Sequence, residues 1–381
     1  MIPRTIFESE HELFRESVRR FLEAEVVPYH EQWEEDGQVD RELWRKAGAQ
    51  GFLAPTVPEA FGGVGVDYRY NVIVNEEVSR LGLSGIGWSL HSDISVPYIN
   101  NYGSDAIKDK FLPGCVSGDI VSAIAMTEPG TGSDLQNIKT TAVLDGDEYI
   151  INGSKTFITN GQHADVVIVV AKTDPDAGGM GVSLILVESG TPGFEKGQNL
   201  KKVGMKAQDT SELFFTDVRV PKGNLLGKAG EGFIYLMQEL AQERLTIGTI
   251  AVAASESMLE QTINYTKERN AFNRPVSAFQ NTQFKLAELS TQIAAARTFV
   301  DRCVELHLNK QLNATGASQV KLLSSELQCK VADECLQLHG GYGYMWEYPI
   351  ARAFADSRVQ RIYGGTSEIM KLIIARDLLA N

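Results

Sequence analysis

Two glutamates of the 381-residue chain, Glu239 and Glu243, have the spacing and surroundings of a buried acid or base. They are four residues apart, so a helix would put them one turn from each other. The same stretch carries apolar residues at helical spacing: Phe233, Leu236, Met237, Leu240 and Ile247. One interpretation is a carboxylate that this apolar company partly desolvates, which would raise its pKa toward that of a general base. Taken alone, the pattern favours a solvated glutamate that pairs with Arg244 or with a neighbouring helix.

Two polar loops carry groups able to bind a cofactor. The 125–134 loop reads Ala-Met-Thr-Glu-Pro-Gly-Thr-Gly-Ser-Asp, and its backbone N–H groups and hydroxyls suit a flavin edge or a phosphate. In the 152–161 segment, Phe157 and Thr159 would share one strand face, where a ring stacks on a planar cofactor and a hydroxyl bonds its edge. This segment is not a P-loop, because position 148 lacks the required glycine. Taken alone, the two patterns favour a tight turn and an ordinary hairpin.

Two glycine pairs stand at expected helix boundaries, Gly340-Gly341 after one helix and Gly364-Gly365 before another. Thr366 has the residue type of an N-cap. A helix N-terminus preceded by glycines, whose backbone is not covered by side chains, suits an anionic or carbonyl-rich ligand. Helix capping alone explains both motifs about as well.

Other chemistries have little support in the sequence. The six histidines show neither HxxxH nor HExxH spacing, and no GxSxG elbow is present, so we expect neither a metal centre nor a serine hydrolase. The four cysteines are too few and too irregularly spaced for a disulfide framework, and we expect them reduced in the core. Acidic residues exceed basic ones by 49 − 36 = 13, which disfavours nucleic acid and anionic membranes as partners. No apolar stretch approaches about 18 residues, so no membrane span is expected.

The elements that must position these residues fall into three parts by hydrophobic periodicity. Helical spacing dominates up to about residue 115, with a first helix that Pro28 ends and further helices at 40–50, 69–82 and 104–113. Strand patterns follow, with a hairpin around Asp145-Gly146-Asp147 and no helix between strands, which predicts an antiparallel sheet or barrel. Long helices are then expected at about 231–269, 278–309, 317–338 and 366–379, typical of a bundle. We therefore predict domains over 1–118, 119–230 and 231–381.

Taken together and in this order, these motifs resemble the acyl-CoA dehydrogenase family over essentially the whole chain. The segments that carry the resemblance are TEPGTGSD, FITNG, GMKAQDTSELFFTDVRVP, KERNAFNRPVSAFQ, QLHGGYGYMWEYP and IYGGTSEIMKLIIAR. From Gln242 onward the chain is most similar to the long-chain branch. The resemblance implies a mainly α fold with an α-helical N-terminal domain, a small central β-barrel and a C-terminal four-helix bundle. This agrees with the partition by periodicity.

The resemblance implies bound FAD and α,β-dehydrogenation of an acyl-CoA thioester to the trans-2-enoyl-CoA in β-oxidation. By similarity, one set of residues holds the isoalloxazine ring: Ile124, Ala125, Met126, Thr127, Gly132, Ser133, Phe157, Ile158 and Thr159. A second set binds the diphosphate and adenosine of FAD in a neighbouring subunit: Arg269, Phe272, Gln280, Gln337, Leu338, His339, Gly340 and Gly341. Thr366, Ser367 and Glu368 approach the FAD from a helix start. Sites shared in this way imply a homo-oligomer, usually a tetramer.

The resemblance also changes the interpretation of Glu243. Many members of the family carry the catalytic base as the Glu of a Tyr-Glu-Gly-Thr motif, but this chain reads Tyr-Gly-Gly-Thr at 363–366. The long-chain and isovaleryl branches place the base before an Arg on the first bundle helix, which here is Glu243 before Arg244. We therefore expect Glu243 to be the base, with a pKa raised by desolvation. The expected substrate-binding residues are Ser133, Ala241, Gln242, Arg244, Gly364 and Gly365.

Electron-transferring flavoprotein is the electron acceptor that the resemblance implies. Alternatives with the same fold are an acyl-CoA oxidase, a nitroalkane oxidase and a catalytically silent flavin-binding scaffold. The short chain argues against the oxidase, and Glu243 argues against the other two. The first residues include Glu8, Glu10 and Glu12 and match neither a signal peptide nor a transit peptide. We therefore expect a bacterial cytoplasmic protein, or a mitochondrial matrix protein if the chain is a processed mature form.

Overall fold

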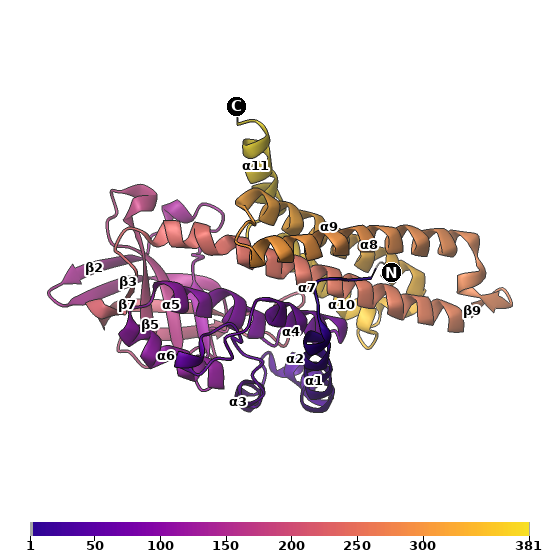
Figure 1. Cartoon of the computed structure of the whole chain (residues 1–381), viewed down its shortest axis with the longest axis horizontal. Helices are drawn as coiled ribbons and strands as arrows, with labels where there is room; N and C mark the ends of the chain where they lie inside the picture. The colour runs from indigo at the N-terminus through magenta and orange to yellow at the C-terminus, as the bar shows by residue number, and fades with distance from the viewer. Residues whose placement is uncertain (1–2, 381) are drawn as a thin grey trace.

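The computed structural model describes residues 3–380 and shows helices, then a β-sheet, then long helices (Figure 1). A π-helix, η2 (Leu90–Ser95), runs directly into α5. The α-helices of the N-terminal part are α1 (Ser9–Glu25), α2 (Val27–Asp36), α3 (Arg41–Ala49), α4 (Arg69–Arg80), α5 (Val96–Tyr102) and α6 (Asp105–Ser117). Neither η2 nor α5 was predicted from the sequence.

Local sequence explains most of these helices. The predicted amphipathic stripe of α1 is present, with Val18 and Leu22 fully buried. Pro28 does not end the helical path, because it lies in the first turn of α2, where its missing N–H is not needed. α6 likewise continues four residues past Pro113, to Ser117, beyond the end predicted for it.

The middle of the chain forms one mixed sheet in the order β6-β7-β3-β2-β4-β5-β8, with β1 pairing on β4. The predicted hairpin is present between β2 and β3, but the prediction of a wholly antiparallel sheet is wrong, because β4 pairs in parallel with both β1 and β2. Within residues 3–380 the ladder ends at β6 and β8, so it does not close into a barrel. The strands are β1 (Ser122–Ala125), β2 (Thr141–Asp145), β3 (Glu148–Thr159), β4 (Val166–Lys172), β5 (Val182–Glu188), β6 (Phe194–Asn199), β7 (Thr210–Pro221) and β8 (Leu225–Leu226).

Strand β4 shows how the sheet is attached to the helices. Its side chains from Val166 to Ala171 are all fully buried, so the strand has no solvent-facing side. Alternate residues serve two cores: Val166, Ile168 and Val170 pack with helical residues such as Tyr98 and Leu236. Val167, Val169 and Ala171 pack inside the sheet with residues such as Ile151 and Phe215. The continuous apolar run in the sequence therefore reflects burial on both faces.

The C-terminal part is built on the 37-residue helix α7 (Gly232–Glu268), which runs along the long axis of the molecule (Figure 1). A short hairpin of β9 (Asn270–Ala271) and β10 (Arg274–Pro275) leads into α8. The remaining helices are α8 (Gln280–Leu308), α9 (Ala314–His339), α10 (Pro349–Ser357) and α11 (Ser367–Leu378). The four long helices match the prediction, whereas α10 was not predicted. Figure 1 shows α11 projecting away from the other helices.

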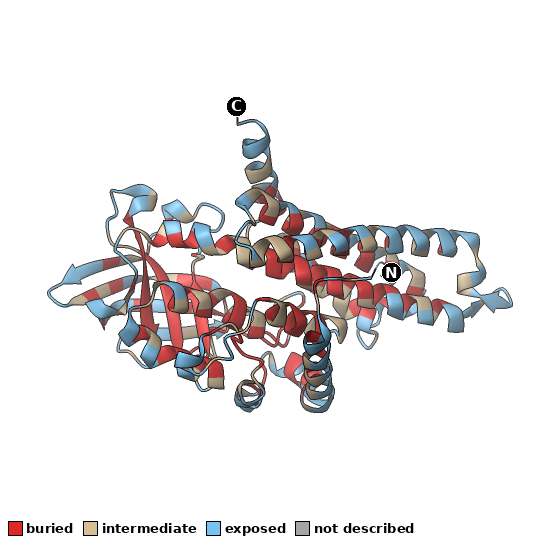
Figure 2. Ribbon diagram, in the orientation of Figure 1, coloured by how far each residue is buried: buried red, intermediate tan, exposed pale blue. Residues whose placement is uncertain are grey.

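Buried residues line the inner faces of these elements, and exposed residues cover the outer turns (Figure 2). Cys115, Cys303 and Cys335 are buried and Cys329 is half-buried, and all four are free thiols. Between residues 3 and 380, no helix combines the length and apolar composition needed to cross a membrane.

A buried ionic junction joins the N-terminal helices to the bundle. The carboxylate of Glu76 on α4 accepts hydrogen bonds from Arg15 on α1 at 2.9 Å and from Arg297 on α8 at 2.6 Å. Arg4 donates to the same carboxylate at 2.9 Å. Burial alone would raise the pKa of Glu76, but these three guanidinium groups hold it well below its ordinary value. Arg297 also donates to Glu256 on α7 at 2.8 Å, so the junction fixes α4 against α8 and against α7, the helix that carries Glu243.

Candidate active site

Glu243 lies on the part of α7 that faces α5, and it is 4% exposed. The hydroxyl of Tyr98 on α5 donates a hydrogen bond of 2.8 Å to Oε1 of Glu243. In the described residues, Oε2 takes part in no hydrogen bond with the protein. Burial raises the pKa of Glu243 to about 7, while the hydrogen bond from Tyr98 lowers this pKa and the charge of Glu239 raises it. Glu243 is therefore a desolvated carboxylate with the pKa of a general base near neutral pH, not a solvated one.

The glycine pair at 364–365 packs on the same face of α7. Gly364 has φ +63°, and a β-carbon there would lie 2.4 Å from Cδ1 of Ile247, one turn after Glu243. Gly365 has φ +96°, and its carbonyl accepts a hydrogen bond of 2.7 Å from Nζ of the buried Lys321. A glutamate at 364 would need both a left-handed backbone and a displaced Ile247. The two alternative positions of a base are thus neighbours, and this chain fills the one on α7.

Arg244 lies beside this loop as a buried cation. Its side chain is 5% exposed, and burial lowers its pKa. Within the described residues it has no carboxylate at ion-pair distance, its Nε has no hydrogen-bond partner, and its Nη1 donates to Ser318 at a long 3.4 Å. A β-carbon at Gly365 would stand 3.9 Å from Nη2 of Arg244. This guanidinium therefore has donors left over for an electron-rich group next to the 364–365 loop.

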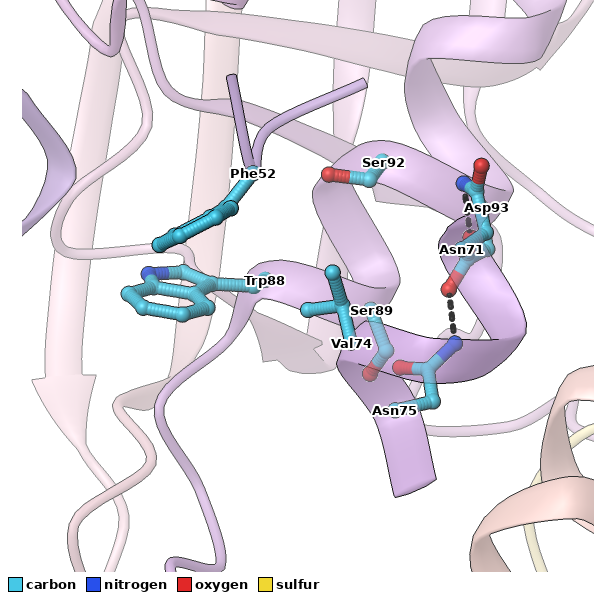
Figure 3. A pocket seen from close by; sticks show the side chains of 8 residues that line it. All are labelled: Phe52, Asn71, Val74, Asn75, Trp88, Ser89, Ser92 and Asp93. Carbon is cyan, nitrogen blue, oxygen red and sulfur yellow. Dashed lines mark hydrogen bonds between the residues drawn. The ribbon is translucent and has the colours of Figure 1, made fainter. Parts of the chain in front are cut away.

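The side-chain amide of Gln242, which was predicted to bind substrate, is already hydrogen-bonded within the protein. Its Nε2 donates to the backbone oxygen of Asp93 at 2.7 Å, and its Oε1 lies 3.0 Å from Nε2 of His307. Figure 3 shows the carboxylate of Asp93 between the side-chain amides of Asn71 and Asn75. The cavity at this place has a volume of only about 10 Å³, room for about one water, so it is not a substrate pocket. Gln242 thus anchors the π-helix that carries Asp93.

The 125–134 loop and the end of β3 come together as the sequence suggested. Nζ of the buried Lys155 donates to the carbonyl of Met126 at 3.0 Å and to Glu128 at 2.9 Å. The N–H of Thr156 donates to the carbonyl of Thr127 at 2.9 Å. These bonds fasten the loop to the strand beside it.

Phe157 stands out at this junction. The register of β3 on β7 shifts between Lys155 and Ile158, and Phe157 has φ +60° and a 66% exposed side chain. The bulge was not predicted, and around it Phe157 is exposed, Ile158 is buried and Thr159 is half-buried. The side chains of Ile124, Ala125 and Ile158 are buried, so any ligand contact from them comes through the backbone. The exposed ring of Phe157 and the loop glycines Gly130 and Gly132, whose β-carbon positions meet nothing within 4 Å, are each open to a planar ligand.

The second predicted set lies at the far end of the bundle. Arg269 caps α7, Phe272 is 91% exposed on the β9–β10 turn, and Gln280 begins α8. The ring of His339 at the end of α9 stacks on Tyr265, with ring centroids 4.2 Å apart, which brings residues 337–341 to the same end. Figure 1 shows β9 and the sheet at opposite ends of the long axis. One chain therefore does not bring the two sets together.

Residues 366–368 lie at the start of α11. Thr366 is the N-cap, accepting a 3.3 Å hydrogen bond from the N–H of Ile369, as predicted. The hydroxyl of the buried Ser367 donates to Glu326, and Glu368 is exposed.

The sequence reasoning missed several residues that contact the predicted site segments. These are Tyr98 at Glu243, Asp93 at Gln242, Lys321 at Gly365 and Lys155 at the 125–134 loop. The one available signal was the spacing of Tyr98 and Tyr102, four apart like Glu239 and Glu243. That signal has meaning only once α5 is known to pack on α7.

Comparison with known proteins gives three family models that match in chain order. They describe the acyl-CoA dehydrogenase N-terminal domain over residues 8–119, the middle domain over 123–218 and the C-terminal domain over 230–379. The chain is 56% identical over 378 residues to the mitochondrial long-chain specific acyl-CoA dehydrogenase of Sus scrofa, spanning 99% of this chain and 88% of that protein.

Solved structures match equally completely. The acyl-CoA dehydrogenase from Geobacillus kaustophilus has a TM-score of 0.98 and 52% identity, covering 99% of this chain and 100% of that chain. A glutaryl-CoA dehydrogenase from Mycobacterium smegmatis in complex with FADH2 has a TM-score of 0.93 and 30% identity, covering 99% and 96% of the two chains.

Proposed function

The chain belongs to the acyl-CoA dehydrogenase family, and from that premise we propose how its own residues carry out the reaction. It is an FAD-dependent oxidoreductase that converts an acyl-CoA thioester to the trans-2-enoyl-CoA in β-oxidation. We propose that Glu243 takes the proton from Cα. The observation that carries this proposal is a buried carboxylate with a pKa of about 7, held by Tyr98 through one oxygen.

The FAD ring fits the surface formed by the 125–134 loop and the end of β3. Phe157 offers an exposed ring, and the exposed loop glycines Gly130 and Gly132 have open space at their β-carbon positions. We propose that residues 124–127, Gly132, Ser133 and 157–159 hold the isoalloxazine, with residues 366–368 approaching from α11. FAD held there would supply the acceptor for the hydride from Cβ. Lys155 keeps the loop and strand in one arrangement for this contact.

The substrate would lie between Glu243 and the 364–365 loop. Ser133, Ala241, Gln242, Arg244, Gly364 and Gly365 are the residues proposed to border it. The spare donors of Arg244 favour an electron-rich group of the substrate or cofactor there. Gln242 would contribute mainly by holding the π-helix, since its amide is already bonded on both sides.

The assembly is proposed to be a homotetramer. The second set, residues 269, 272, 280 and 337–341, would bind the FAD diphosphate and adenosine of a neighbouring subunit, because it lies far from the first set in the same chain. The domain boundaries proposed from the sequence are 118/119 and 230/231. We also propose electron-transferring flavoprotein as the acceptor, a long or branched acyl chain as substrate, and a bacterial cytoplasmic or mitochondrial matrix location.

Glu243→Gln tests the assignment of the base. The amide cannot accept the Cα proton, so kcat should fall by about 10²–10⁴-fold while the protein keeps its FAD. Glu239→Gln, one turn away on the same helix, is the matched control and should keep most of the activity. Near-normal turnover of the Glu243→Gln enzyme would contradict the assignment.

The reaction class is tested on the unaltered enzyme. Anaerobic acyl-CoA should bleach the flavin absorbance, and readmitted air should restore it slowly, as expected of a dehydrogenase. Fast reoxidation by air would indicate an oxidase. Failure of straight-chain, branched and sterol-derived acyl-CoAs alike to bleach the flavin would indicate a catalytically silent scaffold.

A further inference from the structure

Helices α5 and α7 pair tyrosines with glutamates in register. Tyr98 and Tyr102 are four residues apart on α5, and Glu239 and Glu243 are four residues apart on α7. The hydroxyl of Tyr98 donates to Glu243 at 2.8 Å, and the hydroxyl of Tyr102 donates to Glu239 at 2.7 Å. The two hydrogen bonds are thus one helical turn apart on both helices. The earlier tyrosine pairs with the later glutamate, so the order of the pairs is antiparallel.

The first of these pairs is fully enclosed. Tyr98 is 0% exposed and Glu243 is 4% exposed, so water does not compete for the hydrogen bond between them. Burial, together with the nearby charge of Glu243, raises the pKa of the Tyr98 phenol well above its ordinary value. The phenol therefore stays protonated and acts as a donor at every working pH.

We propose that Tyr98 is the positioning residue of the base: its hydroxyl holds Oε1 of Glu243 and so directs Oε2 at the Cα proton of the substrate. The proposal rests on the assignment of Glu243 as the base. A carboxylate without this bond would rotate about its last side-chain torsions, which are broad for glutamate. Holding one oxygen removes that freedom before the substrate arrives.

The helix that carries Tyr98 is itself held from α7. Gln242, the residue before Glu243, donates to the backbone of Asp93 in the π-helix that continues into α5. Two adjacent residues of α7 therefore hold the helix that carries Tyr98. Gln242 bonds the π-helix that leads into α5, and Glu243 accepts the hydrogen bond from the Tyr98 hydroxyl. An insertion in the π-helix would shift Tyr98 relative to the carboxylate.

The charged and titratable groups that act on Glu243 are few. Tyr98 faces it from α5, while Glu239 and Arg244 act from α7 itself. Asp93 of the π-helix is bonded to Asn71 and Asn75 instead. Loss of the phenol hydroxyl removes a donor that favours the ionised carboxylate, so the pKa of Glu243 should rise.

Tyr98→Phe and Tyr102→Phe form a matched pair of variants. Each loses one hydroxyl from the same helix, but only the first loses a bond to Glu243. For Tyr98→Phe, the acid limb of the kcat against pH profile should move up by about one unit and the plateau kcat should fall about tenfold. Tyr102→Phe should leave the limb in place. An unchanged Tyr98→Phe profile, or equal shifts in both variants, would overturn the proposal.

A second measurement avoids any loss of packing in the phenylalanine variant. Replacing Tyr98 by 3-fluorotyrosine keeps the ring and makes the phenol a stronger donor, so the acid limb should move down, opposite to Tyr98→Phe. A limb that does not move, or moves up, would overturn the proposal. Glu243→Gln distinguishes failure of the base assignment from failure of the role given to Tyr98. If that variant stays active, Glu243 is not the base, and the role proposed for Tyr98 is wrong as well. If it is inactive while Tyr98→Phe behaves as the unaltered enzyme, only the role of Tyr98 fails.

Discussion

At the scale of single residues, Glu243 is a buried carboxylate with no cation at ion-pair distance among residues 3–380, in contrast to Glu76. Glu76 is surrounded by three arginines and its pKa is depressed, whereas burial leaves Glu243 with a pKa of about 7. A folded-state pKa above the ordinary 4.5 means that the folded protein binds this proton more tightly than the unfolded chain. The residue therefore lowers stability increasingly as pH rises from 4.5 to about 7.

Glu243→Gln should for this reason stabilise the protein at pH 8 while removing its activity. The gain should be on the order of 1–3 kcal/mol and should disappear near pH 4, where the glutamate is protonated in both states. Thermal unfolding of the FAD-loaded protein at both pH values measures it. Glu260→Gln, an exposed change on the same helix, is the control and should show no such pH-dependent gain. Equal stability of Glu243→Gln and the unaltered protein at pH 8 would argue against a strongly desolvated carboxylate.

Single contacts of this kind lie beyond sequence reasoning. The apolar neighbours of Glu243 within α7 predicted its burial, because helical periodicity is a local property. Its partner Tyr98 is 145 positions away, and no local pattern joins the two. The same holds for Lys321, which reaches the Gly365 carbonyl across 44 positions.

At the scale of elements, the buried pair of Lys155 and Glu128 joins strand β3 to the 125–134 loop. Glu128 also accepts the N–H of Thr140 at 2.9 Å, so this carboxylate ties the loop both to β3 and to the residue before β2. Removing one partner of a buried pair leaves the other charge uncompensated. Loss of either partner should therefore both destabilise the protein and disturb the conformation of the loop.

Lys155→Met should cost about 3–5 kcal/mol of unfolding free energy. Because the 125–134 loop then loses its anchor, FAD should also bind at least about tenfold more weakly, measured by flavin fluorescence on dilution. Lys222→Met breaks the exposed pair with Asp147 beside the same sheet and should cost no more than about 1 kcal/mol. Full FAD affinity in Lys155→Met would show that the loop does not depend on this pair.

Elements with strong periodicity were predictable, and short ones were not. The four long helices and the β2–β3 hairpin follow from apolar spacing and from Asp145-Gly146-Asp147. The π-helix and α5 span only 13 residues together, too few for a clear 3.6-residue pattern. The parallel pairing of β1 with β4 depends on strands that are far apart in sequence, so it could not be read locally.

At the scale of the whole molecule, the junction around Glu76 connects parts of the chain that periodicity separates. Arg4 and Arg15 come from the start of the chain and Arg297 from the bundle. Because the folded-state pKa of Glu76 is depressed, its contribution to stability is present above the unfolded value near 4.5 and is lost as pH falls toward the folded one. The acid side of the stability profile should thus report on this contact.

Glu76→Gln should destabilise the protein by about 3–5 kcal/mol at pH 7, because three arginines lose their shared carboxylate. The difference in unfolding free energy between the variant and the unaltered protein should shrink below pH 4, because the stabilisation from the ionised Glu76 is then being lost. Urea unfolding at the two pH values measures it. Glu188→Gln, which breaks the exposed pair with Lys110, serves as the control and should change stability by less than about 1 kcal/mol. A pH-independent difference would contradict the role given to Glu76.

The length of α7 has a consequence for evolution of the family. Glu243 lies within α7 and Arg269 caps the end of the same uninterrupted helix, so the 26 steps between them span roughly 39 Å at 1.5 Å per residue. The length of α7 therefore sets the separation, within each subunit, between the proposed base and the residues proposed to bind the FAD of a neighbouring subunit. A single inserted residue would turn one end by about 100° against the other. Variation in chain length should therefore gather in the connecting loops and spare this helix.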